Sequence, residues 1–241
     1  MPTGLYVALS AQMAMERRLA TVANNVANMN TAGYRAERIR FETVMDNAGG
    51  RDVAFASVGE TYTDLTAGQS KFTGNPLDVA VQGDAWFSVK TPAGIAYTRD
   101  GRMHMSAEGQ LLSVNNHPVL DAGGTPLAID PAGGEVRIGS DGSISQGTVA
   151  VGKVGLFTIP AGAALTRADN SSVIPDQAAE VVQDFTNVAI HQGYSESSNV
   201  DPIREMTRLI MIQRAFEQAM AAVSQVESST DNAIRTLGPG S

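Results

Sequence analysis

The sequence contains no cysteine and few aromatic residues. Without cysteine the chain forms no disulfide, offers no thiolate to a metal and has no cysteine nucleophile. This fits a protein that works outside the cytosol without relying on oxidative folding. Aromatic residues make up 5% of the chain, with Trp86 as the single tryptophan, so the core must be built mainly from Val, Leu, Ile, Met and Ala.

Positive charge is scarce as well. The 17 Lys and Arg residues against 25 Asp and Glu residues give a net charge of -8. Nucleic acid is not an expected partner, because phosphate binding needs clustered Lys and Arg. His104, His117 and His191 lie far apart without the spacing of metal ligands, and no nucleotide-binding or hydrolase fingerprint is present. We therefore expect no cofactor, no metal site and no enzymatic activity.

Long uninterrupted apolar runs are also missing. The first residues lack the basic and apolar regions of a secretory signal, so a chain that leaves the cytosol would need another route. Near the C-terminus, charges such as Arg204, Glu205 and Arg208 interrupt the stretch of about 20 apolar residues that a membrane helix needs. We expect no direct membrane insertion.

The sequence does contain an apolar repeat of seven residues at each end, with the spacing of a coiled-coil seam. These repeats predict one helix over residues 3–29 and another over 202–237, the second capped by Asp201 and opened by Pro202. The seam positions that we assign to assembly in the first helix are Leu5, Gln12, Met15, Leu19, Val22 and Val26. In the second helix they are Met206, Leu209, Gln213, Phe216, Met220 and Val223.

Both predicted helices are apolar beyond the seam. Tyr6, Leu9 and Met13 lie off the first seam, and Ile203 and Ile210 lie off the second. A helix that is apolar on several faces must be buried on several sides. We interpret this pattern as packing against other protein chains, and the alternative is a pair of core helices within one monomeric domain.

The middle of the chain has the pattern of short strands separated by turns. Strands are predicted over residues 78–81, 86–90, 96–99, 111–113, 136–138, 144–146 and 154–158, with a loop from about 161 to 173. The expected fold class is α+β, with long N- and C-terminal helices pairing as a coiled coil and an all-β middle domain. The expected organisation is a helix over 1–30, an extended connector over 31–75, a β domain over 76–192, and a linker and helix over 193–241.

Four asparagines crowd the end of the first predicted helix, at Asn24, Asn25, Asn28 and Asn30. Asparagine is a weak helix former, so their presence needs a compensating gain. One interpretation is a frayed helix end with Asn30 or Gly33 as its cap. The other is that the amides bond neighbouring helices in an assembly, and we include all four among the candidate assembly residues.

This segment resembles the axial proteins of the bacterial flagellum, whose rod and hook members carry A-N-N-L-A-N-x-N-T-x-G-F-K/R after the first helix. The matching residues are Ala23, Asn24, Asn25, Ala27, Asn28, Asn30, Thr31, Gly33 and Arg35. Val26, Ala32 and Tyr34 stand where the family usually has Leu, Pro and Phe. Further similarity over residues 77–87, 97–101, 198–206 and 213–217 extends the resemblance to nearly the whole chain. A proximal rod protein matches best, with the distal rod protein as the near competitor.

The resemblance implies a non-enzymatic subunit of the basal-body rod in the periplasmic space, forming part of the drive shaft and export tube. Its implied partners are copies of itself, neighbouring rod proteins and the flagellar type III export apparatus. The alternative from another class is a monomeric β-domain binding module that carries a helical hairpin. Apolar helix faces beyond the seam favour the rod subunit, because a monomer would leave these faces exposed.

Overall fold

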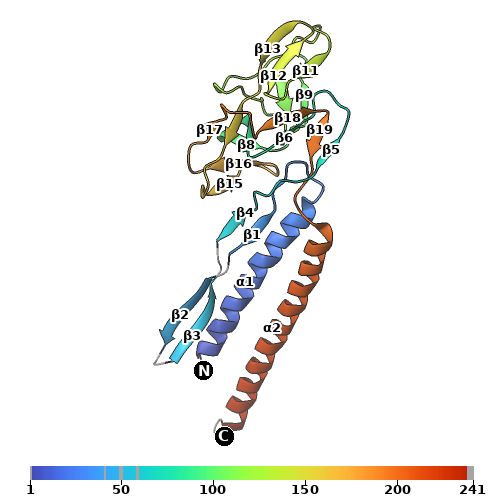
Figure 1. The fold of residues 1–241 in the computed structure, drawn as a ribbon. Coiled ribbons are helices and arrows are strands. Elements are labelled where there is room, and N and C mark those ends of the chain that lie inside the picture. Colours follow the sequence, from blue (N-terminus) through green and yellow to red (C-terminus); the bar gives the residue numbers. More distant parts are fainter. Residues whose placement is uncertain (1, 41, 49–50, 58–59, 238–241) are drawn as a thin grey trace. The chain divides into compact units, whose positions relative to one another are not determined.

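The computed structural model describes residues 2–40, 42–48, 51–57 and 60–237 (Figure 1). Side chains are described for residues 10, 12–40, 60–221, 224, 225 and 228. The chain divides into two compact units, which we describe one at a time. Unit 1 consists of Met1–Ala27, Glu37–Tyr62 and Asp201–Ser241, and unit 2 consists of Asn28–Ala36 and Thr63–Val200.

Unit 1 contains both helices. Helix α1 (Pro2–Ala27) and helix α2 (Pro202–Leu237) lie side by side (Figure 1). At 1.5 Å per residue they are roughly 39 Å and 54 Å long. The Oδ1 atom of Asp201 accepts hydrogen bonds from the backbone N–H groups of Ile203 and Arg204, each at 3.1 Å, which confirms the predicted cap.

Two pairs of strands complete unit 1. Strand β1 (Glu37–Ile39) pairs with β4 (Thr61–Thr63), and β2 (Glu42–Ala48) forms an antiparallel pair with β3 (Arg51–Ser57). Both β1 and β3 contact α1. The region predicted as an extended connector therefore carries paired strands that pack on the first helix.

The predicted fold class is wrong, because the terminal helices do not pair as the expected coiled coil. Such a coil would bury Met206 and Gln213, yet both are exposed, while Glu205 and Ile212 are buried in their place. Helix α1 also packs on strands, which a two-stranded coil has no room for. The physical reason is that Glu205 and Ile212 form a second row with the same seven-residue spacing as Met206 and Gln213. Glu205 pairs with Arg38 and Arg208, and the seven-residue repeat does not indicate these partners.

Unit 2 is built from antiparallel strands. Its largest sheet has the order β15-β16-β8-β7-β14-β17. These strands are β7 (Trp86–Thr91), β8 (Gly94–Thr98), β14 (Leu156–Thr158), β15 (Leu165–Arg167), β16 (Ser172–Pro175) and β17 (Glu180–Val181). A three-stranded sheet is formed by β11 (Val136–Ile138), β12 (Ser143–Gln146) and β13 (Val149–Lys153).

Three two-stranded pairs complete unit 2. They are β18 (Ala189–Gln192) with β6 (Val79–Gln82), β19 (Tyr194–Glu196) with β5 (Ser70–Phe72), and β10 (Leu111–Ser113) with β9 (Met103–Met105). All seven strands predicted over 78–158 are present within two residues of their expected starts. The loop expected over 161–173 is instead occupied by β15 and the start of β16.

The core of unit 2 is apolar and continuous. Val79, Phe87, Leu111 and Ile144 are all buried in it. Trp86 lies in a second cluster with Ile159 and Val173. The alternation of side chains along a strand explains this separation, since Trp86 and Phe87 are neighbours that face opposite sides of β7.

Candidate functional site

Helix α2 presents the predicted seam partly to solvent. Met206, Gln213 and Met220 are exposed, and Leu209 and Phe216 are half-buried. The exposed seam residues extend a row of apolar side chains that includes Ile203 and Ile210. We call Ile203, Met206, Ile210 and Met220 the α2 stripe; their exposed fractions are 76%, 44%, 51% and 45%.

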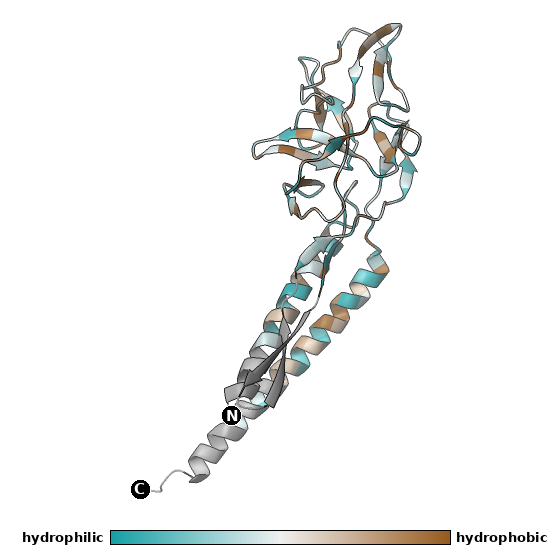
Figure 2. Ribbon diagram, turned by 60° about the vertical axis from the view of Figure 1, so that its left-hand side comes forward, coloured by the Kyte–Doolittle hydropathy of each residue, from teal (hydrophilic) through white to brown (hydrophobic). Residues whose placement is uncertain are grey.

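The α2 stripe lies on one side of the helix. Its members are three, four and ten residues apart, which places them within one sector at about 100° per residue. Glu205 and Ile212, which are buried, lie on the adjacent sector. Brown and teal residues alternate along the coloured part of α2 in Figure 2, as expected for a helix whose apolar residues fall on more than one face.

On α1 the predicted seam is more covered. Val22 is buried, and Gln12, Met15, Leu19 and Val26 are half-buried. Buried positions also include Ala14, Thr21 and Asn25, which lie next to the predicted seam. The side chains of Leu5 and Val223 lie outside the described residues.

The asparagines at the end of α1 bond within the chain. Asn25 Nδ2 donates to the backbone oxygen of Glu37 at 2.9 Å, and Asn25 Oδ1 accepts from the Glu37 N–H at 2.8 Å. Asn24 Nδ2 donates to Glu37 Oε2 at 3.3 Å. These bonds fix strand β1 to α1 and give a local gain that offsets the weak helix propensity of asparagine.

The other two asparagines belong to unit 2. Asn28 is buried, and its Oδ1 accepts a hydrogen bond from the Thr31 hydroxyl at 3.1 Å, whereas Asn30 is exposed. Gly33 has a φ of 67°, a backbone conformation that favours glycine. The turn after α1 is therefore held by defined bonds.

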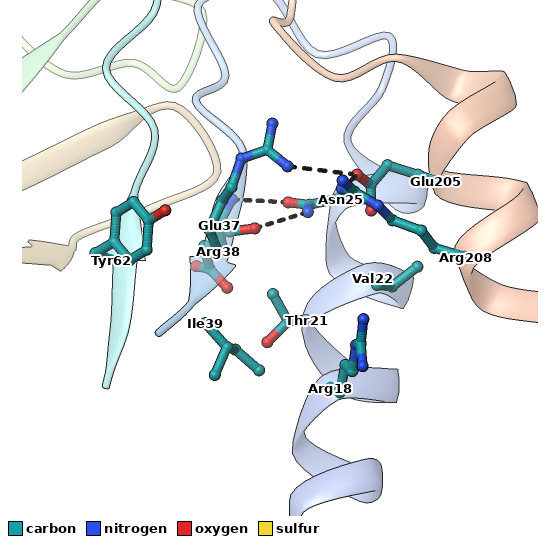
Figure 3. Close-up of a pocket in the computed structure, with 10 residues that line it drawn as sticks. All are labelled: Arg18, Thr21, Val22, Asn25, Glu37, Arg38, Ile39, Tyr62, Glu205 and Arg208. Atoms are coloured by element: carbon teal, nitrogen blue, oxygen red, sulfur yellow. Dashed lines mark hydrogen bonds and ion pairs between the residues drawn. The ribbon is translucent and has the colours of Figure 1, made fainter. Parts of the chain in front are cut away.

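A cavity of about 170 Å³ opens in unit 1 between α1, β1, β4 and α2 (Figure 3). Arg18, Arg38, Arg208, Glu37 and Glu205 bring charge to its wall. Glu205 Oε1 pairs with Arg208 Nη1 at 2.5 Å and with Arg38 Nη1 at 4.0 Å. From its sequence position Glu205 is one of the charges that interrupt an apolar stretch, and in the structure it is a buried partner of two arginines.

A second buried charge cluster lies in unit 2. Glu196 Oε1 pairs with Arg35 Nη2 at 2.6 Å, and Glu196 Oε2 pairs with Arg99 Nε at 2.8 Å. Arg99 also donates to the backbone oxygens of Gly83 and Val81. Burial lowers the pKa of the Arg35 guanidinium, and the charge of Glu196 opposes that change. This cluster joins segments from both ends of unit 2.

Among the described residues, no three His, Asp or Glu side chains are grouped so as to hold a metal ion. None of the helices searched in the described part of the chain is long and apolar enough to cross a membrane.

Family profiles match three parts of the chain. "Flagella basal body rod protein" matches residues 5–35, "Flagellar hook protein FlgE/F/G D1 domain" matches 80–146, and "Flagellar basal body rod FlgEFG protein C-terminal" matches 191–236. The flagellar basal-body rod protein FlgF of Mesorhizobium japonicum is 51% identical over 238 residues, covering 99% of both chains. FlgF of Rhizobium meliloti is 45% identical with the same coverage.

The chain belongs to the FlgF family of flagellar basal-body rod proteins. The rod protein FlgG of Bacillus subtilis is less similar, at 29% identity over 262 residues and 97% of both chains, which favours the FlgF family over the alternative. Membership confirms the predicted structural, non-enzymatic role and the location in the flagellar basal body. Proteins of this family assemble with other rod and basal-body proteins.

Proposed function

We propose that this FlgF-family chain polymerises with copies of itself and with neighbouring rod proteins through its terminal helices, forming part of the drive shaft and export tube. The observation that carries the proposal is the α2 stripe. Four large apolar side chains on one sector of a helix, each more than two-fifths exposed, are costly in a monomer and suit a surface that another chain covers. The half-buried seam residues Leu209 and Phe216 border this surface.

The stripe has the chemistry of a helix-packing surface. Ile203, Met206 and Ile210 are three and four positions apart, which is the spacing at which one helix presents anchors to another. Gln213 lies within it, and a polar residue in such a row favours one register of packing over others. We therefore assign Met206, Gln213 and Met220 to contacts between subunits. The seam residues of α1 are assigned to packing that holds this helix in place: Gln12, Met15, Leu19, Val22 and Val26.

A charge placed in the stripe tests the proposal. Met206→Asp should leave the isolated chain folded, since Met206 is exposed, but should prevent rod completion because assembly would bury an unpaired carboxylate. Gln218→Asp is the matched control, because Gln218 is an exposed residue of α2 away from the stripe. Motility in soft agar and the content of purified basal bodies are the measurements. Normal motility and normal basal bodies with Met206→Asp would contradict the proposal.

Export through the flagellar type III apparatus, in an unfolded state, is the second part of the proposal. The absence of cysteine supports it, because no disulfide has to form or break during transfer and refolding. A strain that lacks a functional type III apparatus should retain the chain in its cytoplasm. Appearance of the chain outside the inner membrane in that strain would exclude this route.

A further inference from the structure

Strand β5 of unit 2 has an open edge that bears an exposed aromatic side chain. It belongs to a two-stranded sheet with β19 as its partner, with the register Phe72↔Tyr194, Lys71↔Ser195 and Glu196↔Ser70. All three residues of β5 are exposed. No strand in the described part of the chain pairs with its other edge.

The flanking hydrogen bonds show which backbone groups face that edge. The N–H of Thr73 donates to Gly193 O at 2.8 Å, and the N–H of Ser197 donates to Gln69 O at 2.8 Å. Facing residues along an antiparallel ladder alternate between hydrogen-bonded and non-hydrogen-bonded pairs. Lys71 and Ser195 lie midway between the two flanking bonds, two residues from each, so they form a hydrogen-bonded pair. The N–H and C=O groups of Ser70 and Phe72 therefore point away from β19.

An aromatic patch, defined as Phe72, Tyr194 and His191, lies beside these groups. Phe72 is 67% exposed and Tyr194 is 37% exposed. Their ring centroids are 5.3 Å apart in an edge-to-face arrangement, and Tyr194 meets His191 in the same way at 6.2 Å. In a chain with 5% aromatic residues, such a grouping on the surface is a large apolar anchor beside backbone groups that point away from β19.

We infer that the β5 edge binds an extended segment of a neighbouring rod subunit, which adds a strand to the β19–β5 sheet and places an apolar side chain on the aromatic patch. A strand is the occupant that fits, because an open ladder edge offers donors and acceptors at the spacing of another backbone. Lys71 projects from the opposite face of β5 and opposes indiscriminate edge pairing by other chains. The inference rests on the proposed assembly into the rod.

Another exposed edge lacks this combination. Strand β13 ends the three-stranded sheet, and its Val149 is 65% exposed, almost as much as Phe72. Strand β13 has no aromatic residue, and its pairing with β12 carries a register shift between Ile144 and Ser145. Val149 is therefore a matched control for exposure at a strand edge.

Photo-crosslinking in assembled basal bodies tests the inference. The photoreactive residue p-benzoylphenylalanine is introduced at Phe72 in one strain and at Val149 in another, and basal bodies are purified and irradiated. We expect a crosslink from position 72 to a rod protein, with much weaker crosslinking from position 149. Presence of the chain in basal bodies without a crosslink from position 72 would overturn this inference alone, whereas absence of the chain from basal bodies would overturn the proposed function as well.

A proline substitution tests the role of the backbone. Ser70→Pro removes an N–H that faces the open edge, so the Tm of the isolated chain should change little while the crosslink from position 72 is lost. Lys71→Pro removes an N–H that faces β19 and should lower the Tm. An undiminished crosslink with Ser70→Pro would contradict strand addition.

Discussion

Asn25 ties two elements of unit 1 together through both atoms of its amide. It is buried, and it donates to and accepts from the backbone of Glu37 at 2.9 Å and 2.8 Å. Buried amides with both bonds satisfied specify one arrangement, because any other arrangement leaves polar groups unpaired. This single residue therefore sets where β1 runs along α1.

Replacing Asn25 should destabilise unit 1. Asn25→Ala leaves the N–H and C=O of Glu37 without these partners, which should cost about 1–3 kcal/mol in the free energy of unfolding. Asn24→Ala is the matched control, since Asn24 is half-buried and its bond to Glu37 Oε2 is longer, at 3.3 Å. Denaturant unfolding followed by circular dichroism at 222 nm measures both. Equal losses of unfolding free energy in the two variants would contradict a larger contribution from the Asn25 bonds.

At the level of secondary structure, α2 has one face that packs within unit 1 and another that is exposed. Ile212 and Glu205 face inward within unit 1, and the α2 stripe faces outward. Helix bounds, the cap and the seven strands over 78–158 could be predicted from the sequence, because apolar periodicity and local turn chemistry fix them. Which face of α2 is buried could not be predicted, because Ile212 and Met206 belong to two rows with the same spacing. The arginines that pair with Glu205 are also distant in sequence or on the next helical turn, so they give no local signal.

The two faces of α2 should respond differently to charge. Ile212→Asp buries an unpaired carboxylate within the monomer, so the isolated chain should lose helical signal at 222 nm. Met206→Asp should keep that signal, since its side chain is exposed in the isolated chain. Circular dichroism of both purified variants makes the comparison. Loss of helix in both variants would contradict the assignment of the two faces.

At the scale of the whole molecule, each unit is assembled from separate stretches of sequence. The predicted boundaries follow the order of the chain, whereas Asn28–Ala36 belongs with the β structure of unit 2. The ion pair of Arg35 with Glu196 and the hydrogen bond from the Gly33 N–H to Glu196 O, at 2.8 Å, hold that segment in place. Such pairings between residues far apart in the sequence leave no local pattern. The resemblance therefore indicated that Asn28–Ala36 matters, but it could not predict Glu196 as the partner of that segment.

If the chain assembles through α2, the α2 stripe is covered when the chain joins the rod. Because the natural sequence has no cysteine, Met206→Cys introduces a single thiol, and Glu108→Cys introduces one at an exposed turn of unit 2 as a control. Maleimide labelling is compared in the isolated chain, in intact basal bodies and in the same basal bodies after denaturation. We expect rapid labelling of position 206 in the isolated chain and after denaturation, with strong protection in intact basal bodies while position 108 still reacts. Equally rapid labelling of position 206 in intact basal bodies would contradict assembly through α2.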